Sequence, residues 1–112
     1  MVTIYIPDRG DIVWLGFDPQ LGHEQSGRRP TIVLSDKSYN QTVGLMLVCP
    51  ITSKVKNYPF EVRIKTDVID GVILADQIKS LDWRRRDASF IAKSSAETIR
   101  KALLLIKALL EY

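Results

Sequence analysis

One short polar stretch of the sequence holds the residue types that proton transfer beside a phosphate would need. Within seven residues it places a histidine, a carboxylate, an amide and two guanidinium groups, at His23, Glu24, Gln25, Arg28 and Arg29. A carboxylate can accept a proton from a hydroxyl, and a guanidinium can stabilise negative charge that develops on a phosphate oxygen. The alternative is a solvated ion pair between Glu24 and either arginine, which would contribute little to stability. His23 is the single histidine, so it could transfer a proton near neutral pH but cannot form a two-imidazole site.

A second group of polar residues follows the longest apolar run of the chain, Leu45–Ile51. Thr52 and Ser53 offer hydroxyl groups, and Lys54 and Lys56 add positive charge directly after them. These groups could hold a phosphate, whereas Ser and Thr at the end of a strand are also common turn residues. Both interpretations remain open from the sequence.

A third candidate combines an aromatic ring with cations. Trp83 precedes Arg84, Arg85 and Arg86. An indole surface next to guanidinium groups would suit single-stranded nucleic acid, because bases stack on aromatic rings and cations hold the backbone. The alternative is an ordinary solvated run of arginines.

Composition limits the chemistry that these residues could support. The 112 residues, 46% hydrophobic and 26% charged, predict one globular domain over residues 1–112. The net charge is +3, and residues 53–86 carry eight basic against five acidic side chains, a mild bias towards polyanions. The sequence contains one Cys, one His and no glycine-rich phosphate loop, so we expect phosphate chemistry to depend on side-chain cations without metal or cofactor.

The cysteine content and the hydrophobicity pattern predict a cytoplasmic protein. Cys49 lies inside the apolar run and has no second cysteine with which to form a disulfide, as expected in a reducing compartment. The apolar run is too short to cross a bilayer, and the N-terminus lacks a basic region followed by an apolar stretch, so no membrane association is expected.

Five segments have the composition of short strands bounded by turn residues, which favours a small barrel or sandwich. They are Asp11–Phe17, Thr31–Leu34, Gly44–Thr52, Phe60–Lys65 and Val72–Leu81. The first two are joined by the twelve residues Asp18–Arg29, a length typical of functional or disordered loops. The third is apolar throughout, which is typical of burial on both faces, while Pro50 within it implies a bulge or an edge. The fourth alternates apolar and charged residues, and Asp70 and Gly71 are predicted to form a turn before the fifth.

The C-terminal segment changes to helical periodicity. Ser94 and Glu97 have the spacing of a capping box, which predicts a helix from about Ala96 to the end of the chain. Its apolar stripe is predicted at Ile99, Leu103, Ile106 and Leu110. Further apolar residues widen this stripe, namely Leu104, Leu105, Ala108 and Leu109. The wide stripe is explained either by a partner subunit or by a small barrel that buries both sides of its one long helix.

Several segments together resemble the MazF/PemK family of toxins from bacterial toxin–antitoxin pairs, and the MazF and ChpB types in particular. The similar segments, in order, are Pro7–Trp14, Gly22–Pro30, Pro50–Thr52, Tyr58–Val62 and Gly71–Ser80. The resemblance spans nearly the whole chain, and its most specific part is the Gly-x-Glu-Gln-x-Gly-x-Arg-Pro loop at residues 22–30. Arg28, Ser53 and the charged residues between Thr52 and Pro59 depart from the family pattern, and this leaves the preferred bases open.

The resemblance implies a mainly β fold with a C-terminal helix, the SH3-like barrel of the MazF/PemK/CcdB type. It also implies a homodimer that cuts single-stranded RNA, chiefly mRNA, at short sequence motifs without a metal, leaving a 2′,3′-cyclic phosphate and a 5′-hydroxyl and so inhibiting translation. A cognate acidic antitoxin would neutralise it, in a heterohexamer or a similar assembly. The family's catalytic residues correspond to Glu24, Arg29 and Thr52. The residues expected to bind RNA are His23, Gln25, Arg28, Ser53, Lys54, Lys56, Gln77, Lys79, Arg84 and Arg86.

Two other functions remain open on the same fold. One is a non-enzymatic gyrase poison like CcdB, but such poisons depend on a tryptophan close to the C-terminus, whereas this chain ends Leu109–Tyr112. The other is a barrel that binds RNA without cutting it. Glu24 distinguishes the alternatives, because a binding protein needs the cations and an enzyme also needs the proton acceptor. Which of Glu24, Arg29 and His23 acts as acid and which as base stays open, although the high pKa of arginine favours charge stabilisation for Arg29.

Overall fold

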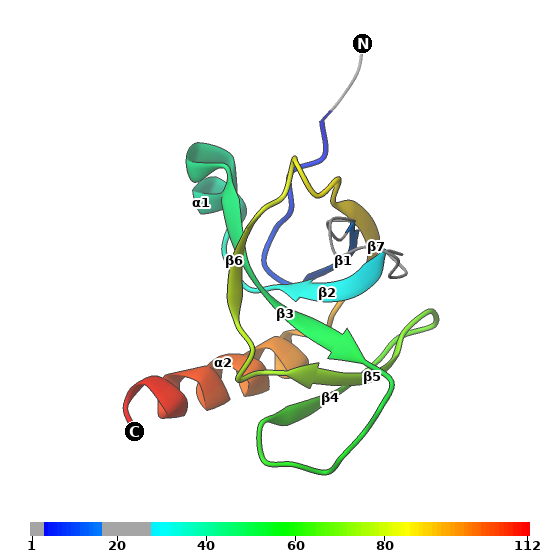
Figure 1. Ribbon diagram of the computed structural model, residues 1–112, viewed down its shortest axis with the longest axis vertical. Coiled ribbons are helices and arrows are strands. Elements are labelled where there is room, and N and C mark those ends of the chain that lie inside the picture. Colours follow the sequence, from blue (N-terminus) through cyan, green and yellow to red (C-terminus); the bar gives the residue numbers. More distant parts are fainter. Residues whose placement is uncertain (1–3, 17–27) are drawn as a thin grey trace, which may run out of the picture.

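The structure is a computed structural model that describes residues 4–16 and 28–112. The elements of this part are β1 (Asp11–Leu15), β2 (Arg29–Val33), α1 (Lys37–Val43), β3 (Leu45–Thr52), β4 (Glu61–Lys65), β5 (Asp70–Leu74), β6 (Lys79–Asp82), β7 (Ser89–Lys93) and α2 (Ala96–Leu110). The strands form one curled antiparallel sheet in the order β4-β5-β3-β2-β1-β7, with β6 added on β3, and α2 lies across one side of it (Figure 1). The mainly β, half-barrel fold with a C-terminal helix is therefore confirmed. No helix in these residues has the length and apolarity needed to span a bilayer.

β3 holds the sheet together because it changes neighbours along its length. Leu45–Val48 pair with β6, whereas Ile51 and Thr52 pair with β5, and β2 lies along the opposite edge. Pro50 falls where one neighbour has ended and the next begins, so its missing N–H group is accommodated inside a central strand. The bulge or edge predicted from Pro50 is a change of partner.

The apolar sequence of β3 has a related explanation. Met46 and Val48 are buried in the first half of the strand, and Cys49 and Ile51 in the second, so the buried side changes from even to odd positions. Burial of both faces at once was the wrong interpretation. Each half buries one face, and the two faces are opposite, because Met46 and Val48 pack into one hydrophobic cluster and Cys49 and Ile51 into the other.

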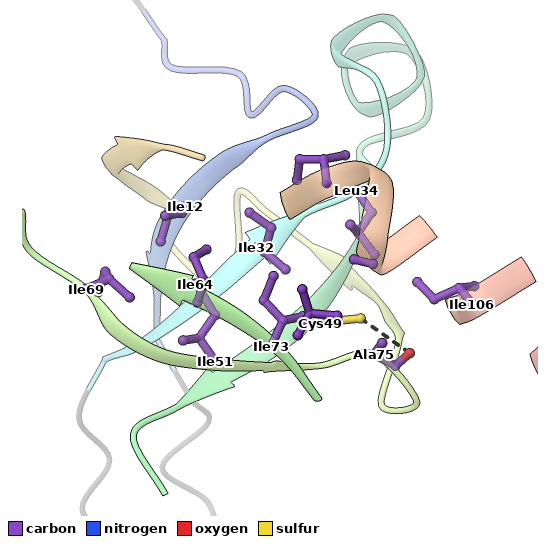
Figure 2. Close-up of a cluster of buried hydrophobic side chains, with 13 residues drawn as sticks. Ile12, Ile32, Leu34, Cys49, Ile51, Ile64, Ile69, Ile73, Ala75 and Ile106 are labelled. Carbon is purple, nitrogen blue, oxygen red and sulfur yellow. Dashed lines mark hydrogen bonds between the residues drawn. The ribbon is translucent and has the colours of Figure 1, made fainter. Parts of the chain in front are cut away.

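Two hydrophobic clusters fill the two sides of the sheet. The first collects isoleucines from β1 to β5 around Cys49 and is covered by α2 (Figure 2). The Cys49 thiol lies 3.8 Å from the Ala75 carbonyl oxygen, and burial raises its pKa to about 12, so it stays protonated at neutral pH. The second cluster packs Val13, Leu15, Val33, Met46 and Val48 around Trp83.

α2 begins at Ala96, as predicted, but its N-cap lies one residue after the Ser94 of the expected capping box. The N-cap is Ser95, whose hydroxyl accepts from the Thr98 amide at 3.1 Å, and Glu97 instead pairs with Arg100. The buried face of the helix comprises Ile99, Ala102 and Ile106. The predicted stripe is therefore half wrong, since Leu103 and Leu110 are exposed together with Leu104.

Two further predictions about the elements are corrected, and two elements are new. The segment Val72–Leu81 forms parts of two strands, β5 and β6, separated by a turn. Asp70 and Gly71 belong to β5 and do not form the turn before it. Two elements were not predicted at all: β7, and α1, which begins after the N-cap Asp36 and ends at Gly44 with φ of 84°.

Candidate active site

A pocket of about 520 Å³ opens where the start of β2, the end of β3 and the start of β5 meet. It is lined by Arg28, Arg29, Pro30, Ile51, Thr52, Ser53, Lys54, Val68, Ile69 and Asp70. Three of these side chains are cationic, and one of them, Arg28, is paired with Asp87 at 3.2 Å. The one acidic side chain, Asp70, is paired with Arg63 at 2.9 Å, so Arg29 and Lys54 give the lining its net positive charge. The pocket is therefore electropositive and suited to an anionic ligand such as a phosphate group.

The structure brings together two of the three residues predicted to be catalytic. Arg29 is the first residue of β2 and is paired with Leu15, while Thr52 is the last residue of β3 and is paired with Val72. Both line the pocket. The Thr52 hydroxyl accepts from the Lys54 amide at 3.1 Å, which leaves its own O–H available as a donor. Glu24, the third residue, lies outside the described residues, as do His23 and Gln25.

Gly71 is a residue that the sequence analysis did not connect with the site. A Cβ atom at this position would lie 2.3 Å from the Thr52 carbonyl oxygen, so only glycine lets β5 approach the backbone of Thr52 this closely. Gly71 therefore allows β5 to pack closely against the backbone of Thr52 and so helps to hold Thr52 in position. The signal was present in the Asp70–Gly71 pair, but that pair was interpreted as a turn.

Ser53 and Lys54 lie in the pocket, at the start of the connection from β3 to β4. Further along, the Glu61 carboxylate accepts from the Lys56 and Asn57 amides, both at 2.9 Å. The Tyr58 hydroxyl donates to Asp76, and this hydrogen bond raises the pKa of Tyr58. The carboxylates of Glu61 and Asp76 thus hold the far end of this connection. Lys56 has its backbone amide bound in this way but does not line the pocket.

Four other residues predicted to bind RNA lie away from the pocket lining. Gln77 is in the turn between β5 and β6, and Lys79 is the exposed first residue of β6. Arg84 and Arg86 belong to the turn before β7, which Asp82 caps by accepting from the Arg84 and Arg85 amides. Among the described residues, the structure therefore gathers Arg28, Arg29, Thr52, Ser53 and Lys54, and places Lys56, Gln77, Lys79, Arg84 and Arg86 outside the pocket lining.

The interpretation of Trp83 as a stacking surface is wrong. Its side chain is only 2% exposed, and its indole N–H donates to the Asn40 carbonyl at 2.9 Å. Arg84 covers the ring, with its guanidinium carbon 4.9 Å from the ring centroid. The arginines following a tryptophan suggested a nucleic-acid surface, but the ring is needed to fill the second cluster.

Within residues 4–16 and 28–112, the structure contains no group of three or more His, Cys, Asp or Glu side chains arranged to hold a metal ion.

The profile of the PemK-like, MazF-like toxins of type II toxin–antitoxin systems matches residues 8–110 of this curled half-barrel. The chain belongs to this family. It is 51% identical over 89 residues to the endoribonuclease toxin MazF of Escherichia coli, covering 80% of each chain. It is 37% identical over 110 residues to the endoribonuclease toxin ChpB of Escherichia coli, covering 93% of this chain and 94% of ChpB. A crystal structure of MazE–MazF from Deinococcus radiodurans superposes with a TM-score of 0.91 at 48% identity, covering 96% of this chain and 98% of that one.

Proposed function

We propose that this protein is a toxin that cuts single-stranded RNA, chiefly mRNA, at short sequence motifs without a metal and thereby inhibits translation. The observation that carries the proposal is the meeting of Arg29 and Thr52 in one electropositive pocket. Its relatives are endoribonucleases, and two of them share at least 37% of their residues with it over most of its length. We further propose that residues 1–112 act as one cytoplasmic domain.

The proposed reaction is a displacement at phosphorus by the neighbouring 2′-hydroxyl. Glu24 accepts the proton of that hydroxyl, the 2′-oxygen bonds to phosphorus, and the bond from phosphorus to the 5′-oxygen breaks. The products are a 2′,3′-cyclic phosphate and a 5′-hydroxyl, whose oxygen takes up one proton. Arg29 stabilises the charge that develops on the phosphate oxygens, because a guanidinium keeps its proton at neutral pH. The Thr52 hydroxyl donates to a non-bridging oxygen.

RNA binding extends the proposal beyond the reacting phosphate. Ser53 and Lys54 line the pocket and are placed to hold the adjoining backbone. Lys56, Gln77, Lys79, Arg84 and Arg86 would contact nucleotides on either side, together with His23 and Gln25 of the segment outside the described residues. Because most of these contacts are to phosphates, affinity should fall steeply with salt.

The proposed partners are a second copy of this chain and an acidic antitoxin. MazF of Deinococcus radiodurans has been crystallised with MazE. On this chain, the exposed Leu103, Leu104 and Leu110 offer an apolar surface on α2, which also carries Arg100, Lys101 and Lys107. Such a helix suits a partly disordered acidic segment that folds on binding. We propose a homodimer, assembled with antitoxin as a heterohexamer or a similar complex.

One digestion tests the nuclease assignment and the metal requirement together. The protein is incubated with total RNA in excess chelator, and the cleavage ends are sequenced and their end groups identified. We expect cutting at one short motif, with cyclic phosphate and 5′-hydroxyl ends. Loss of all cutting in chelator, restored by a divalent ion, would contradict metal independence, and RNA binding without cutting would favour a non-catalytic barrel. In the latter case Glu24→Gln would leave RNA binding unchanged.

A further inference from the structure

Arg28 differs from the other cations of the pocket because its guanidinium is already engaged. One terminal nitrogen, Nη1, donates to the Asp87 carboxylate at 3.2 Å. The other, Nη2, donates to the Asp87 carbonyl and to the Ser89 hydroxyl, both at 2.7 Å. These partners lie 59 and 61 residues further along the chain, so the contacts join distant segments. A planar guanidinium can make such a fork, whereas a lysine ammonium cannot.

The position of this forked hydrogen bond in the sheet lets it connect two strands that are not paired with each other. β1 lies between β2 and β7, and at its end Leu15 is paired with Arg29 while Trp14 is paired with Ser89. The Arg28 side chain therefore crosses the end of β1 and links its two neighbours. The residue that it holds most directly is the next in the chain, Arg29.

The turn that receives Arg28 is itself firmly anchored. Trp83 fixes one side of this turn in the core, and the Ala88 amide donates back to the Trp83 carbonyl at 3.0 Å. Asp87 closes the turn with φ of 54°, a left-handed conformation that Asp tolerates better than most residues. The Gly16 amide, directly after β1, donates to the Arg86 carbonyl at 2.9 Å. A tryptophan and arginine segment that suggested RNA stacking thus forms a rigid support beside the pocket.

We propose that Arg28 is a positioning residue: by clamping the start of β2 to residues 87–89, it fixes Arg29 in the pocket. The proposal rests on the nuclease function proposed above. Coulomb attraction is not the main contribution, since the side chains of Arg28 and Asp87 are 38% and 87% exposed and exposed pairs are weak. The fork contributes geometry, and small displacements of a catalytic group reduce rates strongly.

The test combines single-turnover cleavage at saturating RNA with RNA affinity and amide exchange. In Arg28→Ala we expect the cleavage rate to fall by about tenfold or more, while the dissociation constant changes less than about twofold, because an ordering contact is lost and no RNA contact is. Arg28→Lys keeps the charge and should not restore the rate.

Asp87→Asn and Ser89→Ala remove side-chain partners of Arg28 while keeping the backbone, and should each reproduce part of the loss. Once Arg28 is alanine, neither should have a further effect. Arg100→Ala removes a guanidinium that is paired with Glu97 on α2 and does not line the pocket, and it serves as the matched control.

A readout without catalysis separates this proposal from the nuclease assignment. Amide hydrogen exchange at Arg29 and Thr31, on either side of Pro30, should become faster in Arg28→Ala and Ser89→Ala and stay unchanged in Arg100→Ala. If the parent protein does not cut RNA, the proposed function fails while exchange still tests the clamp. The clamp is refuted if exchange at these residues is unchanged. It is equally refuted if Arg28→Lys restores the rate. A third refuting outcome is that Arg28→Ala acts only by weakening RNA binding, with the slope of log K against log salt concentration reduced in magnitude by about 0.7, as loss of one phosphate contact would cause.

Discussion

The two halves of β3 show how one strand serves two purposes. In the first half, Met46 and Val48 pack into the cluster around Trp83, and the backbone pairs with β2 and β6. In the second half, Cys49 and Ile51 pack into the isoleucine cluster beneath α2, and the strand ends at Thr52 in the pocket. The first half contributes stability through buried volume, whereas the end of the second half contributes chemistry through polar groups fixed by backbone pairing.

This difference implies that stability and activity can be altered separately. A cavity in the first half should cost folding free energy and leave the pocket intact, because the pocket is lined by the end of the strand and by β2 and β5. Loss of a polar group in the pocket should do the opposite. Substitutions in the first half of β3 and in the pocket can test whether stability and activity change independently.

Met46→Ala addresses the first half. Met46 is fully buried, so the substitution should lower the free energy of unfolding by about 2–5 kcal/mol, measured by denaturant unfolding. At a temperature where the variant is folded, its cleavage rate should equal that of the parent protein. Met46→Leu is the matched control and should cost less than about 1.5 kcal/mol, because volume is conserved. A folded Met46→Ala that cuts slowly would show that the two halves are coupled.

Arg29→Ala addresses the pocket. Removing a group that stabilises developing charge should lower the cleavage rate by about 10² or more. The melting temperature should change little, since the Arg29 side chain is exposed. Arg100→Ala provides the comparison, because it removes an equal charge from α2 and should cut at the parent rate. Normal folding together with normal cutting in Arg29→Ala would refute the assignment.

Much of the fold was predictable because its signals are local. The alternation in Glu61–Lys65 predicted one wet face, and Val62 and Ile64 are the buried pair. The change to helical spacing near residue 96 located α2 within a residue. α1 was missed because seven residues are too few for a periodic signal, although its Asp36 cap and Gly44 stop were both visible.

The errors in the site share a different cause, which is that neighbours in space were unknown. Gly71 follows an Asp, a pair typical of a turn, yet its role depends on Thr52, nineteen residues earlier in the chain at the end of β3. Trp83 next to arginines resembled a nucleic-acid surface, and only the packing of β3 against it shows that the ring is internal. The joining of Arg29 with Thr52 was expected from family resemblance alone, because spacing in the sequence carries no information about a pairing across the sheet.

Gly71→Ala tests whether backbone packing fixes the functional end of β3. The added methyl would lie 2.3 Å from the Thr52 carbonyl oxygen, so the backbone must shift, at a cost of about 1–3 kcal/mol. We expect the cleavage rate of the folded variant to fall by about tenfold, because Thr52 moves with its carbonyl. Gly44→Ala is the matched control: its left-handed φ of 84° makes alanine unfavourable by about 1–2 kcal/mol, but nothing lies within 4 Å of the added atom. If both variants lose activity equally, the effect reflects stability and not the position of Thr52.

Trp83→Phe is expected to have little effect on function and tests the hydrophobic cluster against which the first half of β3 packs. The phenyl ring keeps most of the buried volume but loses the donor to the Asn40 carbonyl, which should lower the free energy of unfolding by about 1–3 kcal/mol. RNA affinity should change by less than about twofold, because the ring is covered by Arg84 and by the core and no base can stack on it. Fluorescence anisotropy with a short uncleavable RNA measures this affinity. Arg84→Ala in the same assay should weaken binding. It should also reduce the magnitude of the slope of log K against log salt concentration by about 0.7, as expected for one lost phosphate contact. If Trp83→Phe weakened RNA binding tenfold while remaining folded, the indole would have to reach the RNA, and its assignment to the core would be wrong.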